Sequence, residues 1–125
     1  MVRKAASLCL ILVLSLCVLS PAFAQKATVL RVLIVKSDNI SAYLQELERG
    51  KEMMKKLGIP EVLRVWQATY AGPNTGTVVV SIEYPSLTAL AEASAKMNAD
   101  KDMLAWLKGL DNLRKIVSDS IYREL

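Results

Sequence analysis

The stretch that decides the fold spans residues 61–84 and reads EVLRVWQATYAGPNTGTVVVSIEY. Residues 62–70 and 77–84 are rich in β-branched and aromatic side chains and alternate with a period of two, which predicts two β-strands. Residues 71–76 between them hold two glycines, a proline and an asparagine, which are typical of chain reversals. We therefore predict a β-hairpin against which the rest of the chain packs.

The amino-terminal residues have the pattern of a secretion signal. Arg3 and Lys4 precede an apolar run at 8–19, and residues 22–24 (AFA) form a small-x-small cleavage site. We expect residues 1–24 to be a cleaved signal peptide, residues 25–125 to form one domain, and the protein to be exported to a bacterial periplasm or secreted. The run is shorter than the ~20 residues of a membrane-spanning helix, so no membrane partner is expected after cleavage.

The composition argues against several kinds of chemistry. The sequence has no histidine, and both cysteines, Cys9 and Cys17, lie in the predicted leader. Histidine-based zinc sites, imidazole-ligated haem and Ser-His or Cys-His nucleophiles are therefore not expected, nor is any metal or cofactor. Without the two basic residues of the leader, the chain has 14 basic and 12 acidic side chains with the signs interspersed, so no nucleic-acid partner is expected.

Four further elements follow from periodicity and capping residues. Residues 28–36 and 115–123 predict a first and a last strand. A helix is predicted to start after residues 37–39 (SDN), which offer three N-cap candidates, and to end at Gly58 and Pro60. A second helix starts at residues 85–86 and is interrupted near Asp100, which is expected to cap its second piece.

The element order is β-α-β-β-α-β, which predicts an α+β, ferredoxin-like fold: a four-stranded antiparallel sheet with two helices on one face. We assign the helix-covered face to Leu30, Val32 and Ile34 with Val78, Val80 and Ile82. The second face then carries Val29, Leu33, Val35, Val79, Trp66 and Tyr70, which is too apolar to stand in water. We therefore predict a homodimer whose sheets pair face to face.

The faces of the last strand remain open from the sequence. Asp119 and Arg123 share one side, and Ser118, Ser120 and Tyr122 share the other. Both sets mix polar and large side chains, so alternation does not indicate which of them faces the helices.

The residues also resemble a known superfamily, the dimeric α/β-barrel proteins. The stretch from Tyr43 through residues 50–51, 56–58 and 64–68 to residues 83–87 looks like the small NIPSNAP-like and antibiotic-biosynthesis-monooxygenase-like branches. Residues 99–106 (ADKDMLAW) are similar to their interrupted second helix. The resemblance covers nearly all of residues 25–125 and implies two sheets closed face to face. Members include cofactor-free monooxygenases, isomerases and haem enzymes, but the haem branch uses a histidine that this chain lacks.

The space between the paired sheets is the predicted site. The residues assigned to it are Arg31, Arg64, Trp66, Tyr70, Ser81 and Glu83. Trp66 and Tyr70 would stack on a flat ligand while Arg64 meets an anionic group. The alternative is a purely structural role. The aromatic and arginine residues would then be only a dimer contact, and Arg31 would pair with Glu83 on the neighbouring strand.

Two functions are compatible with these residues. The first is an exported binding module that holds a small apolar or aromatic molecule between its sheets. The alternative is a cofactor-independent monooxygenase or isomerase acting on an aromatic or quinone-like substrate. In the second case Glu83 is the candidate base, and Arg31 or Arg64 stabilises the resulting anion.

Overall fold

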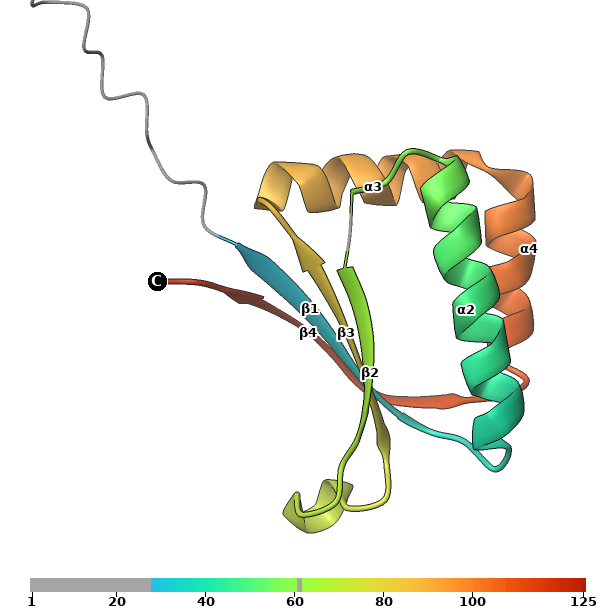
Figure 1. Ribbon diagram of the computed structural model, residues 1–125, viewed down its shortest axis with the longest axis vertical. Helices are drawn as coiled ribbons and strands as arrows, with labels where there is room; N and C mark the ends of the chain where they lie inside the picture. The colour runs from blue at the N-terminus through green and yellow to red at the C-terminus, as the bar shows by residue number, and fades with distance from the viewer. Residues whose placement is uncertain (1–27, 61) are drawn as a thin grey trace, which may run out of the picture.

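The computed structural model describes residues 28–60 and 62–125 (Figure 1). The predicted signal peptide with its two cysteines, and Glu61 at the start of the hairpin, lie outside the described residues. The elements in chain order are β1 (Val29–Lys36), α2 (Ile40–Lys56), β2 (Val62–Gln67), the 3-10 turn η2 (Gly72–Asn74), β3 (Val78–Tyr84), α3 (Leu87–Ala99), α4 (Lys101–Leu110) and β4 (Lys115–Arg123).

The four strands form one antiparallel sheet in the order β2-β3-β1-β4. Helices α2, α3 and α4 all lie on one side of this sheet (Figure 1). This arrangement confirms the predicted α+β, ferredoxin-like fold. We call the side of the sheet away from the helices the open face.

The helix starts are capped as the sequence predicts. Asn39, the last of the three candidates, accepts a hydrogen bond from the backbone N–H of Ala42 at 3.1 Å. Ser86 caps α3 at 3.0 Å, and Asp100 ends α3 and caps α4 by accepting from the Met103 N–H at 2.8 Å. These bonds satisfy amide groups that have no partner within a helix, so they fix where each helix begins.

The prediction for the two faces of β1 is wrong. The register pairs Leu33 with Val80 and Val35 with Val78, and directly opposed residues point to the same side of a sheet. Val29, Leu33 and Val35 therefore lie under the helices, where they are buried. Leu30, Val32 and Ile34 lie on the open face instead, while Val78, Val80 and Ile82 of β3 are on the helix side as predicted. Both sides of β1 are apolar, so the alternation of its residues does not indicate which side faces the helices.

Pairing with β1 also assigns the faces of β4. Asp119 lies opposite Leu33 and Arg123 opposite Val29, which puts both on the helix side. Ser118, Ser120 and Tyr122 lie on the open face. The register shifts between Ile34 and Val35, where β4 carries an irregularity near its start.

The core lies between the sheet and the helices, and its most enclosed side chains include Tyr43, Met103 and Leu110. Met103, Trp106 and Leu110 form the buried side of α4. On α3, Ala93 and Met97 are buried, whereas Leu87 and Ala91 are exposed. Alanines occur on several sides of α3, so its periodicity is weak. Within the part of the chain that the structure describes, no helix combines the length and apolarity needed to cross a membrane.

Candidate functional site

Four of the predicted site residues lie together on the open face. Arg64 is opposite Ser81 in the register, and Glu83 is opposite Val62, two pairs further along the same two strands and therefore on the same face. The Trp66 indole N–H donates to the Ser81 hydroxyl at 3.0 Å, while 54% of the Trp66 surface remains exposed. The open face therefore presents an aromatic ring held in one orientation, beside an arginine and a glutamate.

The other two predicted residues lie elsewhere. Strand β2 ends at Gln67 rather than at residue 70, and Tyr70 follows it into the loop with 99% of its surface exposed. Arg31 lies opposite Ile82 on the helix side of the sheet, so its assignment to the open face is wrong. The expected Arg31–Glu83 pair is also wrong, because the partner of Arg31 is Asp119.

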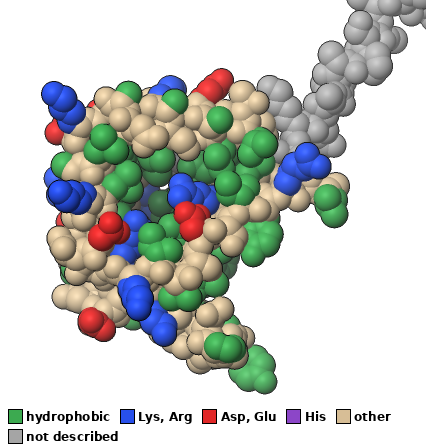
Figure 2. Space-filling model, turned by 180° about the vertical axis from the view of Figure 1, so that it is seen from behind, with side chains coloured by type: hydrophobic (Ala, Val, Ile, Leu, Met, Phe, Trp, Pro, Cys, Tyr) green, Lys and Arg blue, Asp and Glu red, His purple; other side chains and the backbone are tan. Residues whose placement is uncertain are grey.

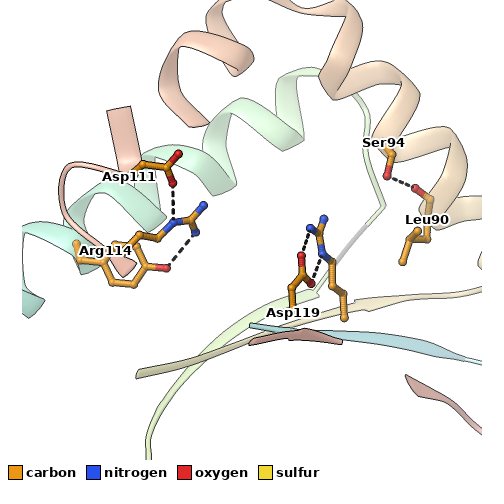
Figure 3. Close-up of polar contacts among 7 residues, drawn as sticks. Leu90, Ser94, Asp111, Arg114 and Asp119 are labelled. Carbon is orange, nitrogen blue, oxygen red and sulfur yellow. Dashed lines mark hydrogen bonds and ion pairs between the residues drawn. The ribbon is translucent and has the colours of Figure 1, made fainter. Parts of the chain in front are cut away.

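The Arg31–Asp119 pair joins β1 to β4 on the helix side of the sheet. The Nε of Arg31 donates to Oδ1 of Asp119 at 2.9 Å, and Nη2 donates to Oδ2 at 2.6 Å (Figure 3). Two parallel bonds of this kind fix the plane of both groups. About a third of each side chain remains accessible to solvent, 31% for Arg31 and 36% for Asp119.

Each member of this pair shifts the titration of the other. The hydrogen bond from Arg31 holds the pKa of Asp119 below its ordinary value, against the opposing effect of partial burial. The positive charge of Arg114 lowers the pKa of Asp119 further. The bond to Asp119 raises the pKa of Arg31 in turn. Both groups are therefore charged at neutral pH, and Asp119 is a weaker base than an isolated aspartate.

A cleft opens beside this pair, and we call it the α3 cleft. It has a volume of about 410 Å³ and is lined by Arg31, Leu90, Ser94, Asp119 and Ile121. The Ser94 hydroxyl donates to the Leu90 carbonyl oxygen one turn earlier, at 2.9 Å (Figure 3). Figure 2 shows a hollow in the face seen from behind, in which basic and acidic side chains lie among hydrophobic ones. A concave, largely apolar space with a few fixed polar groups is typical of small-molecule sites.

A second charged cluster lies in the connection between α4 and β4. The Arg114 side chain is only 10% exposed and lies over the ring of the fully buried Tyr43, 6.0 Å from its centroid. Its Nη1 donates to the Tyr43 hydroxyl at 3.3 Å, and its Nε lies 3.6 Å from Oδ1 of Asp111 (Figure 3). The latter distance permits an ion pair but is too long for a hydrogen bond.

Asp119 and Arg114 were absent from the set of site residues predicted from the sequence. The signal for Asp119 was present in part, because it shares a side of the last strand with Arg123. Its connection to Arg31 needs the strand register, and the two residues are 88 positions apart. Arg114 lies just before β4, outside any helix or strand, so periodicity could not indicate which side of the sheet its side chain faces.

A larger hollow of about 800 Å³ lies between α2 and α4. Charged residues such as Glu52, Lys56 and Asp102 rim it and are exposed. The buried Trp106 donates its indole N–H to Glu46 at 3.0 Å, so these two lining residues already bond each other. We therefore place the candidate site in the smaller α3 cleft, where a fixed ion pair adjoins apolar walls. Among the described residues, no group of three or more acidic, cysteine or histidine side chains could hold a metal ion.

Comparison with solved structures shows what this geometry resembles. A NIPSNAP family protein from Agrobacterium tumefaciens superposes with a TM-score of 0.62 at 17% sequence identity, over 81% of this chain and 86% of that one. The chain has a NIPSNAP-like fold. An uncharacterised NIPSNAP-like domain protein from Burkholderia xenovorans superposes with a TM-score of 0.57 at 17% identity, over 81% of this chain and 84% of the other.

The same fold occurs in SnoaB, a cofactor-independent oxygenase from Streptomyces nogalater. A mutant form of SnoaB superposes with a TM-score of 0.52 at 13% identity, over 79% of this chain and 92% of SnoaB. No protein-family model and no curated protein sequence matches the chain. These likenesses confirm the resemblance to the NIPSNAP-like and monooxygenase-like branches at the level of the fold.

Proposed function

We propose that this protein is a small-molecule-binding domain that holds an apolar or aromatic ligand in the α3 cleft and works as a homodimer. The observation that carries the proposal is the Arg31–Asp119 pair in a cleft of about 410 Å³ whose walls also include Leu90 and Ile121. A charged pair on the helix side of a sheet loses part of its hydration. Two hydrophobic residues at these positions would pack there at a lower desolvation cost than the pair. Its position next to Leu90 and Ile121 gives a ligand both apolar walls and a polar anchor.

This proposal moves the ligand from the space between the sheets to the space under α3. Arg31 lies on the helix side, so the open face lacks one of the two arginines expected there. The open face then serves as the contact between two copies, and the exposed Trp66 on the edge strand β2 is part of that contact. The cleft lies on the opposite side of the sheet, so dimerisation leaves it accessible.

Binding can be tested with 2-naphthol and isotope-labelled protein in an NMR titration. The proposal predicts shifts in the amide signals of Leu90, Ser94 and Ile121. Leu90→Trp fills the cleft and should abolish them, whereas the matched control Leu44→Trp, at an exposed position on α2, should leave them intact. Shifts confined to Trp66 and Ser81 would place the ligand between the sheets and contradict the cleft. No shifts at either place would contradict binding of this class of molecule.

A second candidate is a cofactor-independent oxygenase, favoured by the likeness to SnoaB. In such a reaction a base removes a proton from a ring methylene carbon of an aromatic substrate, and the carbanion adds dioxygen. The resulting peroxide takes up a proton and loses water, which leaves a carbonyl group at that carbon. Asp119 is a poor base for the first step because Arg31 lowers its pKa.

The carboxylate left for this step is Glu83, diagonal to Arg64 on the open face. Oxygen uptake under air with anthrone, which has a ring methylene carbon, would support the oxygenase if it is lost in Glu83→Gln. Unchanged uptake in that variant would contradict it.

The site of action is proposed to be outside the cytoplasm. The support is the leader pattern of residues 1–24, which ends in a small-x-small sequence. Amino-terminal sequencing of protein recovered from the cell envelope or medium is expected to start at Gln25. An intact Met1 on cytoplasmic protein would contradict export.

A further inference from the structure

Strand β4 lies at one edge of the sheet, and one side of its backbone has no strand beside it among the described residues. Residues 118–123 keep a regular register with β1. The N–H of Glu124 donates to the Thr28 carbonyl oxygen at 2.9 Å and therefore points toward β1. Backbone groups alternate in direction along a strand, so the N–H and C=O groups of Asp119, Ile121 and Arg123 point to the free edge.

The side chains of the same three residues form a pattern that is complementary to itself. Asp119, Ile121 and Arg123 all lie on the helix side of the sheet, in the order acid, apolar, base. Suppose that a second copy of this strand runs antiparallel to the first, with Ile121 opposite Ile121. Asp119 of each copy then faces Arg123 of the other, and two pairs of opposite charge flank an apolar pair.

Neighbouring registers do not match these charges. A register centred on Asp119 places two carboxylates opposite each other, which is unfavourable. A register centred on Ser120 places Asp119 opposite Ile121, and one centred on Tyr122 places Arg123 opposite Ile121. Charges on an edge strand usually prevent pairing with another chain. Here their signs and spacing favour one partner, which is a copy of the same strand.

The three side chains are available for such a contact. Ile121 is 54% exposed. Arg123 is exposed and forms no ion pair with any described residue. Asp119 accepts one hydrogen bond from Arg31 at each carboxylate oxygen, but a carboxylate has about four acceptor positions. Asp119 can therefore accept from a second guanidinium while it keeps its bonds to Arg31.

We propose that the free edge of β4 pairs with β4 of a second copy in antiparallel orientation, centred on Ile121. The facing residues exchange backbone hydrogen bonds, and the helices of both copies lie on the same side of the joined sheet. This contact is separate from the open-face contact, because it uses the edge of the sheet. Asp119 and Ile121 also line the α3 cleft, so the second copy places its own Ile121 and Arg123 beside that cleft.

The edge contact involves one strand from each copy, so it is smaller than a contact between two sheet faces. Small contacts of this kind bury less than about 1,200 Å² and are weak. We expect a dissociation constant on the order of 0.1–1 mM. At micromolar concentration the edge is then mostly unpaired, and the mass rises as the protein approaches millimolar concentration.

Sedimentation equilibrium from micromolar to millimolar concentration measures this association. Arg123→Glu places two acids opposite each other in each facing pair, so it should raise the dissociation constant of the edge contact about tenfold. Lys115→Glu is the matched control: it makes the same change of charge at the other end of β4, where this register provides no facing residue. Arg123→Lys keeps the charge and should keep the association.

A disulfide tests the register itself. Ile121→Cys, in the processed chain that starts at Gln25 and has no other cysteine, places two thiols opposite each other. Facing residues of a hydrogen-bonded pair have Cα atoms about 5.5 Å apart, which is within the range of a disulfide. Ile121→Cys should therefore form covalent dimers under mild oxidation. Ile116→Cys, 43% exposed on the same strand, should form them at least tenfold more slowly.

Three results would overturn the edge pairing. A mass that does not rise toward millimolar concentration would leave this edge to an extended segment of another protein. Equal weakening by Arg123→Glu and Lys115→Glu would show an effect of net charge alone. Equal rates of disulfide formation at positions 116 and 121 would show random encounters. Trp66→Arg should not weaken the edge contact, so the open-face contact and the edge contact can each fail without the other.

Discussion

Arg31 is the third residue of β1, and its neighbours on the same side of the strand, Val29 and Leu33, are buried. A cation there requires a partner, and Asp119 provides one with two hydrogen bonds. The pair thereby ties β4, the edge strand, to the middle of the sheet. Its stability contribution is limited, because solvent reaches about a third of each side chain and screens the attraction.

The first prediction concerns the pH dependence of this pair. Asp119→Asn should lower the free energy of unfolding by about 0.5–1 kcal/mol at pH 7, a value already reduced for solvent screening. The pKa of Asp119 is lower in the folded protein than the value of about 3.9 in the unfolded chain. The stabilisation is therefore fully present above pH 4 and is lost as the pH falls through the folded pKa.

Urea unfolding of both proteins at pH 7 and pH 3 measures this effect. The difference between them should shrink at the lower pH. Glu92→Gln, at an exposed position on α3, is the control and should change stability little at either pH. A difference between Asp119→Asn and the unmodified protein that stays constant from pH 7 to pH 3 would show that the charge of Asp119 is not what stabilises the sheet.

The sequence was sufficient to single out Arg31 but not to place it. The residue stands in a run that is apolar on both sides, so the alternation of VLRVLIVK fits either orientation. Its partner comes from a strand whose sides could not be told apart before the register was known. Arg64, Trp66, Ser81 and Glu83 were grouped correctly because the hairpin fixes their register locally.

At the scale of elements, the packing of α2 against α4 depends on one glycine. The ring of Trp106 lies against Gly50 so closely that a Cβ there would be 2.3 Å from Cη2 and 2.4 Å from Cζ2. The ring is also held by the hydrogen bond from its Nε1 to Glu46 of α2. A glycine in the middle of a helix usually weakens it, so this one is explained by the close approach of the ring.

The second prediction follows from this contact. Gly50→Ala should destabilise the protein by about 1–3 kcal/mol, because overpacking outweighs the gain in helix propensity. Thermal unfolding followed by circular dichroism measures the effect.

Gly109→Ala is the matched control, since it is also a helical glycine but has no atom within 4 Å of an added Cβ. It should be neutral or stabilise by about 0.5 kcal/mol. If both variants change stability in the same direction and by the same amount, the Trp106 contact does not determine how α2 and α4 pack.

Helix boundaries were the best-predicted feature, because caps are local. Asn39, Ser86 and Asp100 each bond an amide three residues ahead, a relation that is visible in the sequence. Gly58 has φ of +67°, and the Ile59 N–H bonds the Met54 carbonyl at 3.1 Å, as expected for the end of α2. The buried side of α3 was harder to predict, because alanine is compatible with both surface and core.

For the whole molecule, the open face is the feature that the single chain leaves unexplained. Val62, Trp66 and Tyr122 are exposed on it, and Leu30, Val32 and Ile34 are only half-buried. On the open face, β1 presents Leu30, Val32 and Ile34 instead of the predicted Val29, Leu33 and Val35. Both sets are apolar, so the open face still needs a partner surface to cover it. A contact of about 800 Å² on each copy is the usual requirement for a stable dimer.

The third prediction tests the position of this contact. Trp66→Arg introduces a charge on the open face, where it would be buried against the second copy, and should give single chains. Leu44→Arg, at an exposed site on α2, should leave the assembly unchanged. Circular dichroism should show the same helix and strand content in both variants. A Trp66→Arg protein with an unchanged mass would place the contact elsewhere.

The most direct test of the account is the mass of the unmodified protein in solution. The open face is proposed to be covered by a second copy of the same sheet, so light scattering coupled to size-exclusion chromatography at micromolar concentration should give twice the mass of one chain. A folded protein with the mass of a single chain under these conditions would contradict the paired sheets.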